Sequence, residues 1–426
     1  MFVFIEVVAL KDIKYIFFFV IYVALHFVEG LPDIGDFSVA QLWKLPIMLL
    51  LIFYVIFTWK RVVSFELWTF ALMFESLFCI DLYINPVSTI SAVFKLIPCV
   101  LIFHYLTNSN KSQKTLKNII LFFSRSICLT SLITLLDILK PLRENKDASM
   151  FGIEGATYYT SLFGAPHAAS SYFAIAIVTL VFFLVKVKRI SKFWVVFDIA
   201  MIIIALISVF KAYVRTGWLM VFVGLVSLFG LKNVVSKRKY FVLFCLLVVF
   251  LCALYYTNEM FHARMTGVNV YSGAGGDGIN MTGSGRISFW MSGLELWTNG
   301  DPYELLFGQG YYKVTENNYS TVGMRVFSHN QFVDALAQHG VIGLVLLILL
   351  FISQYRFIVH RKESLYYRLC LSIFFMTMTF AFFQSLIYFD YAIIYAACLA
   401  VLTKKNKIKV VKNECRILEK STDDRL

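Results

Sequence analysis

The stretch that decides how this chain folds is Ser328-His329-Asn330-Gln331 followed by the apolar run from Val341 to Ile352, VIGLVLLILLFI. Upstream, the same region opens with Gly283-Ser284-Gly285-Arg286 and continues through Gly308-Gln309-Gly310. It joins a polar, glycine-rich segment to an apolar helix, within a chain that is otherwise mostly apolar. We expect the chemistry in this segment and expect the other segments to hold it at a membrane surface.

The composition excludes an ordinary soluble protein. Of the 426 residues 59% are hydrophobic and only 15% are charged, whereas about a quarter are charged in soluble domains. The apolar residues form continuous runs of about the 20 residues that span a bilayer, and a β-barrel would require alternation instead. The sequence therefore predicts an all-α, polytopic integral membrane protein. We interpret its eight cysteines as small buried side chains with no disulfide framework.

The apolar runs predict about twelve transmembrane helices and one long polar loop. The expected spans are 13–27, 42–58, 65–84, 87–106, 118–139, 166–185, 193–210, 217–231, 240–256, 331–353, 367–383 and 386–402. This gives nine helices in 1–256, an extracytoplasmic loop at 257–330, three helices in 331–403 and a basic tail at 404–426. The tail is expected to be cytoplasmic and largely disordered.

The distribution of lysine and arginine predicts which loops face the cytoplasm. With both termini in the cytoplasm, the cytoplasmic loops and the termini hold most of the 39 lysines and arginines, as the positive-inside rule requires. The net charge of +13 is then explained by topology and by anionic lipid, and nucleic-acid binding is the weaker interpretation. The loop at 257–330 has four basic and six acidic residues, so topology does not explain its arginines.

Charged residues within the apolar segments are costly and are usually paired. Glu75 and Lys95 fall at similar depth on neighbouring predicted helices, and we expect a structural ion pair between them rather than a substrate contact. Arg125 lies near a helix end, where its side chain can reach the interface.

Ser328 and Gln331 have the spacing of a capping box just before an apolar helix. This pattern predicts Ser328 as the N-cap and His329 as the first helical residue. The positive end of the helix dipole would then keep His329 neutral, as a general base requires, and the free amides would suit a diphosphate. A polar residue at the membrane interface with no task is the alternative.

Three arginines are candidates for binding an anion. Arg286 begins the run Ile287, Trp290, Met291, Leu294 and Trp297, whose helical spacing predicts an amphipathic helix along the outer membrane surface. Arg215 opens a predicted span, and ten residues separate Arg264 from Gly275 in a glycine-rich stretch. Arginine suits bidentate phosphate contact, whereas interfacial anchoring is the alternative for Arg286 and Arg215, and chance spacing is the alternative for Arg264.

The remaining features give weaker signals. His167 follows Pro166 at a helix start, and a structural role is favoured for it. His262 and His339 have no evident partner, so neutral packing is expected. No Asp-x-Asp motif occurs, so we expect no metal and no cofactor, with arginines in place of a metal at a leaving diphosphate.

Several stretches together resemble the O-antigen polymerase and O-antigen ligase superfamily of bacterial surface-polysaccharide enzymes. They are Gly164-Ala165-Pro166-His167, Arg215-Thr216-Gly217-Trp218, Gly285-Arg286-Ile287-Ser288-Phe289-Trp290, Pro302 before Gly308-Gln309-Gly310, and Ser328-His329-Asn330 before Gly340-Val341-Ile342-Gly343. The resemblance covers about 150–355. Members often carry a Glu shortly before the Gly340-type glycine, where this chain has Gln338-His339, and Asp334 is the nearest candidate to replace it.

The resemblance implies a metal-independent, inverting glycosyltransferase that polymerises undecaprenyl-diphosphate-linked repeat units into O-antigen, capsule or exopolysaccharide. His329 would be the catalytic base, Arg215, Arg286 and Arg264 would bind the diphosphate, and Ser328, Asn330 and Asp334 would support them. The site would face outward from the bacterial inner (plasma) membrane. Membrane lipids are expected partners, a flippase and a chain-length regulator are candidate partners, and nucleic acid is not.

Two other functions are compatible with the sequence. A ligase that transfers glycan to a lipid A core shares the same motifs. A transporter or lipid-linked-sugar flippase is the alternative from another class, but its polar residues would lie at broken helices near the midplane, in related halves. Here the polar residues lie in a loop, and no repeated halves are visible.

Overall fold

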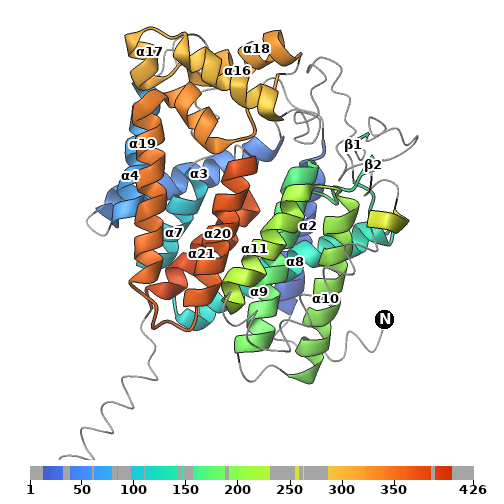
Figure 1. The fold of residues 1–426 in the computed structure, drawn as a ribbon. Helices are drawn as coiled ribbons and strands as arrows, with labels where there is room; N and C mark the ends of the chain where they lie inside the picture. The colour runs from blue at the N-terminus through green and yellow to red at the C-terminus, as the bar shows by residue number, and fades with distance from the viewer. Residues whose placement is uncertain are drawn as a thin grey trace, which may run out of the picture.

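A computed structural model shows the chain as a helical bundle (Figure 1). It describes residues 13–31, 39–59, 62–78, 84, 97–109, 111–141, 146–147, 157–187, 191–230, 255–258, 262, 286–323, 325–384 and 389–404. The main helices are α2 (Ile13–Val28), α3 (Val39–Phe57), α4 (Ser64–Glu75), α7 (Pro98–Asn108), α8 (Gln113–Leu135), α9 (Pro166–Lys186), α10 (Lys192–Lys211), α11 (Arg215–Phe229), α16 (Arg286–Thr298), α17 (Pro302–Phe307), α18 (Gly310–Val322), α19 (Gln331–Val359), α20 (Tyr367–Phe383) and α21 (Phe389–Leu402). A 3₁₀ turn, η2 (Ser76–Phe78), follows α4, and β1 (Lys146–Asp147) pairs antiparallel with β2 (Thr157–Tyr158).

The predicted all-α class is confirmed, whereas the count of twelve spans is not. Four described helices are long and apolar enough to cross a membrane, namely α8, α9, α10 and α19, and α2, α3, α11, α20 and α21 contain shorter apolar helices. The span expected at 65–84 is a shorter helix, α4, which ends at Glu75. Residues 79–83 of that span, 87–96 of the span expected at 87–106 and 240–254 of the span expected at 240–256 lie outside the described residues.

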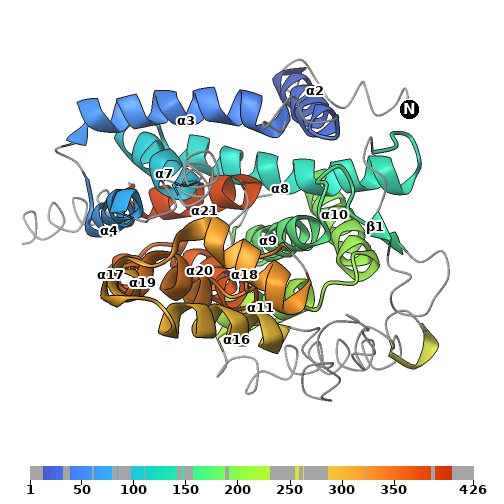
Figure 2. The ribbon, with the colours of Figure 1, turned by 90° about the horizontal axis from the view of Figure 1, so that it is seen from above.

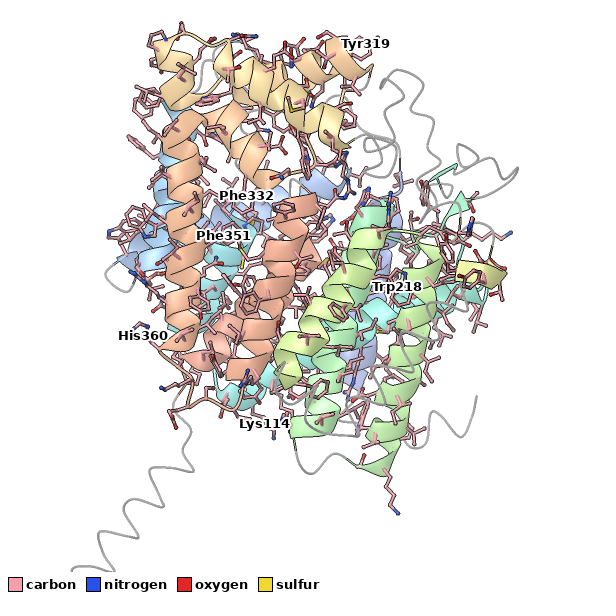
Figure 3. All side chains as sticks on the ribbon, viewed as in Figure 1. Lys114, Trp218, Tyr319, Phe332, Phe351 and His360 are labelled. Carbon is pink, nitrogen blue, oxygen red and sulfur yellow. The ribbon has the colours of Figure 1, made fainter. Side chains whose placement is uncertain are left out.

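Three short helices, α16, α17 and α18, lie across one end of the bundle and are called the cap below (Figure 1). Seen from above, the cap covers α19, α20 and α11, whereas α2, α3 and α8 form a layer on the other side (Figure 2). Lys114 and His360 mark the opposite end of the bundle, called the far end (Figure 3). The far end also holds Lys404, whose Nζ donates to the Thr107 carbonyl at 3.0 Å.

Helix α16 buries a different face from the apolar one that was predicted to lie along the membrane surface. The residues most buried on it are Phe289, Ser292 and Gly293, whereas Met291 of the predicted apolar face is 59% exposed. The buried face packs against α18 and α19. The predicted helix is confirmed, and its position along the outer membrane surface stays a prediction.

Helix α19 is not one straight span. Gly340 has φ +64° and ψ −164°, which breaks the helix, and the rings of Phe332 and Phe351 are only 5.9 Å apart between centroids. In a straight helix a separation of 19 positions would place them about 28 Å apart. The helix therefore folds back on itself into a short arm (331–339) and a long arm (341–359), as the positions of Phe332, Phe351 and His360 show (Figure 3). The sequence predicted a continuous span here.

Two glycines allow the cap to dock against this bend. A Cβ added at Gly308 would lie 2.2 Å from the Gln338 carbonyl, and one added at Gly340 would lie 2.3 Å from the Leu306 carbonyl. Both glycines have positive φ, which side chains rarely adopt. Between them, the Gln309 backbone N–H donates to the Ala337 carbonyl at 2.9 Å. The Gly308-Gln309-Gly310 motif thus attaches α17 to the bend.

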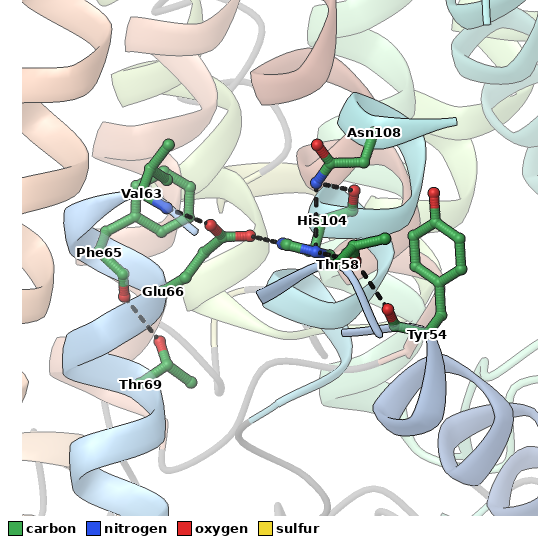
Figure 4. A network of polar contacts seen from close by, with 8 residues as sticks. All are labelled: Tyr54, Thr58, Val63, Phe65, Glu66, Thr69, His104 and Asn108. Atoms are coloured by element: carbon green, nitrogen blue, oxygen red, sulfur yellow. Dashed lines mark hydrogen bonds and ion pairs between the residues drawn. The ribbon is translucent and has the colours of Figure 1, made fainter. Parts of the chain in front are cut away.

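Several charged side chains buried among the described helices form ion pairs. Arg125, whose side chain we expected to reach the interface, donates to both carboxylate oxygens of the fully buried Asp198, at 2.7 and 2.8 Å. In α4, Glu66 contacts His104 Nδ1 at 2.9 Å, and His104 Nε2 contacts Thr58 Oγ1 at 2.7 Å (Figure 4). Such pairing is expected because an unpartnered charge at this depth is costly.

Candidate active site

The turn before the short arm is held by side chains on both sides. Asn330 is the N-cap, and its Oδ1 accepts hydrogen bonds from the backbone N–H of Phe332 and Val333 at 2.9 and 3.3 Å. Asp334 Oδ1 accepts from the Ser328 backbone N–H at 2.9 Å. The predicted capping box with Ser328 as N-cap was therefore wrong, because Asn330 provides the cap two residues later.

This turn places His329 outside the helix, in a left-handed conformation with φ +53°. That conformation costs a residue with a side chain roughly 1–2 kcal/mol, and such positions cluster at functional sites. The three hydrogen bonds to Asn330 and Asp334 described above hold the turn in this shape. His329 is thus not the first helical residue, and the dipole argument for it does not apply as stated.

The side chain of His329 lies among residues from three helices. Its Nδ1 is 3.2 Å from Gln384 Oε1, at the end of α20. Its ring is 6.0 Å from that of His167 at the start of α9, and 5.9 Å from that of Phe289 in α16. Burial, followed by the positive charge of Arg286, lowers the pKa of His329 to about 4. The imidazole is therefore neutral at pH 7, as expected, but for a different physical reason.

Arg286 is brought to this site by the packing of α16 on the turn. A Cβ added at Gly293 would lie 2.8 Å from Ser328 Oγ and 2.9 Å from Val333 Cγ1, so the glycine allows this close approach. The guanidinium of Arg286 lies 5.8 Å from the centroid of the Phe383 ring, one residue before Gln384. An arginine thus lies close enough to His329 to affect its pKa, although 43 positions separate them in the sequence.

Arg215 opens α11, which packs against α9 and α20. The contact is close at this end, because a Cβ added at Gly217 would lie 2.8 Å from Ser170 Cβ on α9. Arg215 and His167 therefore begin neighbouring helices at the end of the bundle where α20 presents Gln384. Arg264 lies outside the described residues.

Residues 200–348 match the family model described as O-antigen ligase. The resemblance to the O-antigen polymerase and ligase superfamily is confirmed. The match contains Arg215, Arg286 and His329, whereas His167 and Gln384 fall outside it. No curated protein matches the chain.

Members of this superfamily often carry a Glu shortly before the glycine that corresponds to Gly340. In this chain a carboxylate from another helix reaches the same place. Glu75 of α4 contacts His339 Nδ1 through Oε2 at 3.0 Å, and Gly343 makes room for both side chains. The expectation that His339 has no partner was wrong. Lys95, the partner predicted for Glu75, lies outside the described residues. Asp334, proposed as a replacement for that Glu, instead binds the Ser328 backbone.

Two residues of this site were missed or undervalued. His167 belongs to a motif that the sequence analysis quoted, but a structural role was favoured for it. Gln384 carried no motif, and only its position just after a predicted span could have drawn attention to it. Within the described residues, no three His, Cys, Asp or Glu side chains are grouped so that they could hold a metal ion.

Proposed function

We propose that this protein is a membrane glycosyltransferase that polymerises oligosaccharide repeat units carried on undecaprenyl diphosphate. One observation carries the proposal: a neutral histidine, His329, lies beside Arg286 at the capped end of a membrane bundle, within the range matched by the O-antigen ligase family. A neutral imidazole can accept a proton, and a guanidinium can bind a diphosphate.

In this mechanism a hydroxyl of the acceptor glycan attacks the anomeric carbon of the donor's first sugar. The new glycosidic bond forms as the bond to the diphosphate oxygen breaks, and that electron pair leaves with the diphosphate. His329 takes the hydroxyl proton, and Arg286 and Arg215 stabilise the departing charge. A single displacement inverts the anomeric centre. Arg264 is a further candidate for binding the diphosphate.

Arg286 would then affect His329 in two ways. In the empty site its positive charge helps to hold the pKa of His329 at about 4. A bound diphosphate would offset that charge, so the pKa of His329 would rise when the donor arrives. The base would become stronger in the complex in which it must act, since an efficient base has a pKa near the working pH.

We further propose that the cap faces outward from the bacterial inner (plasma) membrane. Residues 257–330 would then form an extracytoplasmic loop, and both termini and the tail at 404–426 would be cytoplasmic. Basic residues such as Lys114 and Lys404 at the far end support this orientation (Figure 3). An impermeant thiol reagent should label Tyr319→Cys on the cap in intact cells and should not label Lys114→Cys, and the reverse pattern would refute the orientation.

A ligase that transfers glycan to a lipid A core is the second candidate, and the description of the matched family favours it. Purified protein with a lipid-linked repeat unit alone should make a ladder of longer glycans if it is a polymerase. Product only after addition of lipid A core would identify a ligase. A flippase and a chain-length regulator are the partners proposed for the polymerase in cells.

The proposed mechanism uses arginines where many glycosyltransferases use a metal. Polymer formation should therefore persist in excess chelator. Arg286→Ala should lower it severely, and Arg286→Lys should restore it only in part, because an ammonium lacks the guanidinium fork. Loss of activity in chelator that magnesium or manganese restores would refute this mechanism.

A further inference from the structure

The side chain of Gln384 lies between two histidines. Its Oε1 is 3.2 Å from His329 Nδ1, and its Nε2 is 2.9 Å from His167 Nδ1. Gln384 is the C-cap residue of α20 and is only 4% exposed. One amide thus joins the start of α9 to the turn before α19, and both of its polar groups are used.

The chemistry of an amide determines the proton positions on both rings. A carbonyl oxygen only accepts hydrogen bonds and an amide nitrogen only donates them. His329 must therefore donate from Nδ1 to the Gln384 carbonyl, and His167 Nδ1 must accept from the amide. A neutral imidazole carries one proton, so His329 is left with an unprotonated Nε2. If the amide were reversed, its nitrogen would donate to Nδ1 of His329. Nδ1 would then be the unprotonated nitrogen, but its lone pair would already accept that hydrogen bond and could not take a proton from the substrate.

We propose that Gln384 is a positioning residue whose amide, oriented by His167, holds His329 in the tautomer with Nε2 as the basic nitrogen. The inference rests on the proposed function for its catalytic consequence. Its structural part, the tautomer, can be tested without any activity. Gln384 takes the place that an aspartate takes beside a catalytic histidine in hydrolases, but as a neutral amide it does not stabilise an imidazolium by charge.

The difference between an amide and a carboxylate matters because of the charges around the site. Arg286 reaches His329 from α16, His167 faces it from α9, and Arg215 opens the neighbouring α11, while the Asp334 carboxylate on the short arm is engaged by Ser328. A carboxylate in place of Gln384 would add a negative charge next to His329 Nδ1 and to Arg286. It would raise the pKa of His329 and offset the arginine that we assign to the donor.

The first experiment measures the tautomer. The chain has seven histidines, so ¹⁵N-histidine labelling in a nanodisc gives few imidazole signals, and the signal that disappears in His329→Gln belongs to His329. We expect Nδ1 protonated and Nε2 unprotonated in the native protein, and a mixture of tautomers in Gln384→Met. Gln354→Met is the matched control, because Gln354 is also buried and accepts from Tyr395 Oη at 3.2 Å, away from the cap.

The second experiment measures turnover. Gln384→Met should lower kcat roughly tenfold to a hundredfold, less than the hundredfold to ten-thousandfold of losing a general base outright, and leave KM for the lipid-linked donor within about twofold. Gln354→Met should change neither. Gln384→Glu keeps the acceptor for His329, so it should retain the tautomer and shift the acid limb of the pH–rate profile to higher pH.

The outcomes separate this inference from the proposed function. Nε2 protonated in the native protein, or Gln384→Met with native tautomer and native kcat, would overturn the inference while leaving the glycosyltransferase proposal intact. If Gln384→Met does not fold, Gln384→Glu with an unchanged pH profile would overturn the inference instead. A normal polymer ladder from His329→Ala would show that His329 is not the base, and it would overturn the proposed mechanism and the catalytic part of the inference together.

Discussion

The short arm of α19 has a histidine near each end, and the protein surrounds these two side chains in opposite ways. His339, at the bend, contacts the carboxylate of Glu75 at 3.0 Å. His329, before the arm begins, contacts the amide of Gln384 and lies near the guanidinium of Arg286. A carboxylate favours a charged imidazole, whereas an arginine opposes it. The Glu75–His339 contact therefore attaches α4 to the bend, whereas the surroundings of His329 keep its imidazole neutral.

The other buried histidines follow the pattern of the bend. His104 contacts Glu66 at 2.9 Å, and His26 contacts Asp390 at 3.1 Å. A histidine inside this bundle is therefore not a sign of catalysis by itself. The neighbours distinguish the candidate base, because His329 and His167 are linked through an amide rather than to a carboxylate.

The largest expected difference between the two ends is in activity. His329→Ala should fold normally, bind the lipid-linked donor, and lose about a hundredfold to ten-thousandfold in turnover, the range for general-base catalysis. His329→Gln should do little better, because its amide cannot accept the proton. Polymer ladders in cells lacking the native protein, at matched expression, measure this. A normal ladder would show that His329 does not supply the base.

The next effect concerns the bend and is structural. Gly340→Ala places a methyl group 2.3 Å from the Leu306 backbone at φ +64°, so we expect a loss of roughly 4 kcal/mol in folding stability or failure to fold. Gly323→Ala is the matched control, because φ is +79° there but nothing lies within 4 Å, leaving only about 1–2 kcal/mol of backbone cost. Thermal unfolding in detergent compares the two variants. Equal melting temperatures would refute the docking of the cap on the bend.

His339→Ala should affect stability more than chemistry. It leaves the Glu75 carboxylate buried without its imidazole, which costs about 3 kcal/mol in typical buried pairs. The double variant His339→Ala with Glu75→Gln should regain part of the lost melting temperature, because the buried charge is gone. Polymer formed per folded molecule should stay within about tenfold of the native protein. A loss of turnover as large as that of His329→Ala would place the Glu75–His339 pair in the chemistry.

The smallest expected effect is a change in the pKa of His329. His329 should titrate near pH 4 in the free protein, and in Arg286→Gln it should titrate at higher pH, because the charge that lowers its pKa is gone. Burial is the larger cause, so the pKa should stay below the ordinary 6.5. Since the unfolded chain takes up this proton first, the folded protein should lose stability as the pH falls from about 6.5 towards 4. NMR titration of labelled histidine measures the shift, and an unchanged midpoint would remove Arg286 from the vicinity of His329.

The sequence predicted the features that depend on local composition. Hydropathy was sufficient for the helical membrane class, and the motifs containing Arg286 and His329 identified two residues that the fold does bring together. Both Ser328 and Asn330 are ordinary N-cap residues, and spacing alone favoured Ser328. The choice of Asn330 depends on Asp334, which holds the Ser328 backbone from the far side of the turn.

The features that the sequence could not predict depend on contacts between distant segments. Apolar residues continue through 341–352, so nothing in the local pattern marks a reversal at Gly340. The bend is stabilised by Gly308 and Gln309 of the cap, which dock on it. In the same way, Glu75 meets His339, and Gln384 meets His329 and His167, only once α4, α20 and α9 have packed. No spacing rule relates these positions.

The fold-back of α19 also fixes how far His329 lies from the bend. A continuous helix over 331–359 would be about 44 Å long, well beyond the roughly 30 Å of a bilayer core. Division at Gly340 leaves a long arm of about 28 Å, which matches that thickness, and a short arm that returns about 13 Å from the bend. The length of the short arm therefore sets the depth of His329 below the docked cap. One added helical turn would move the imidazole by about 5.4 Å, out of hydrogen-bonding distance of Gln384, without changing any residue of the site.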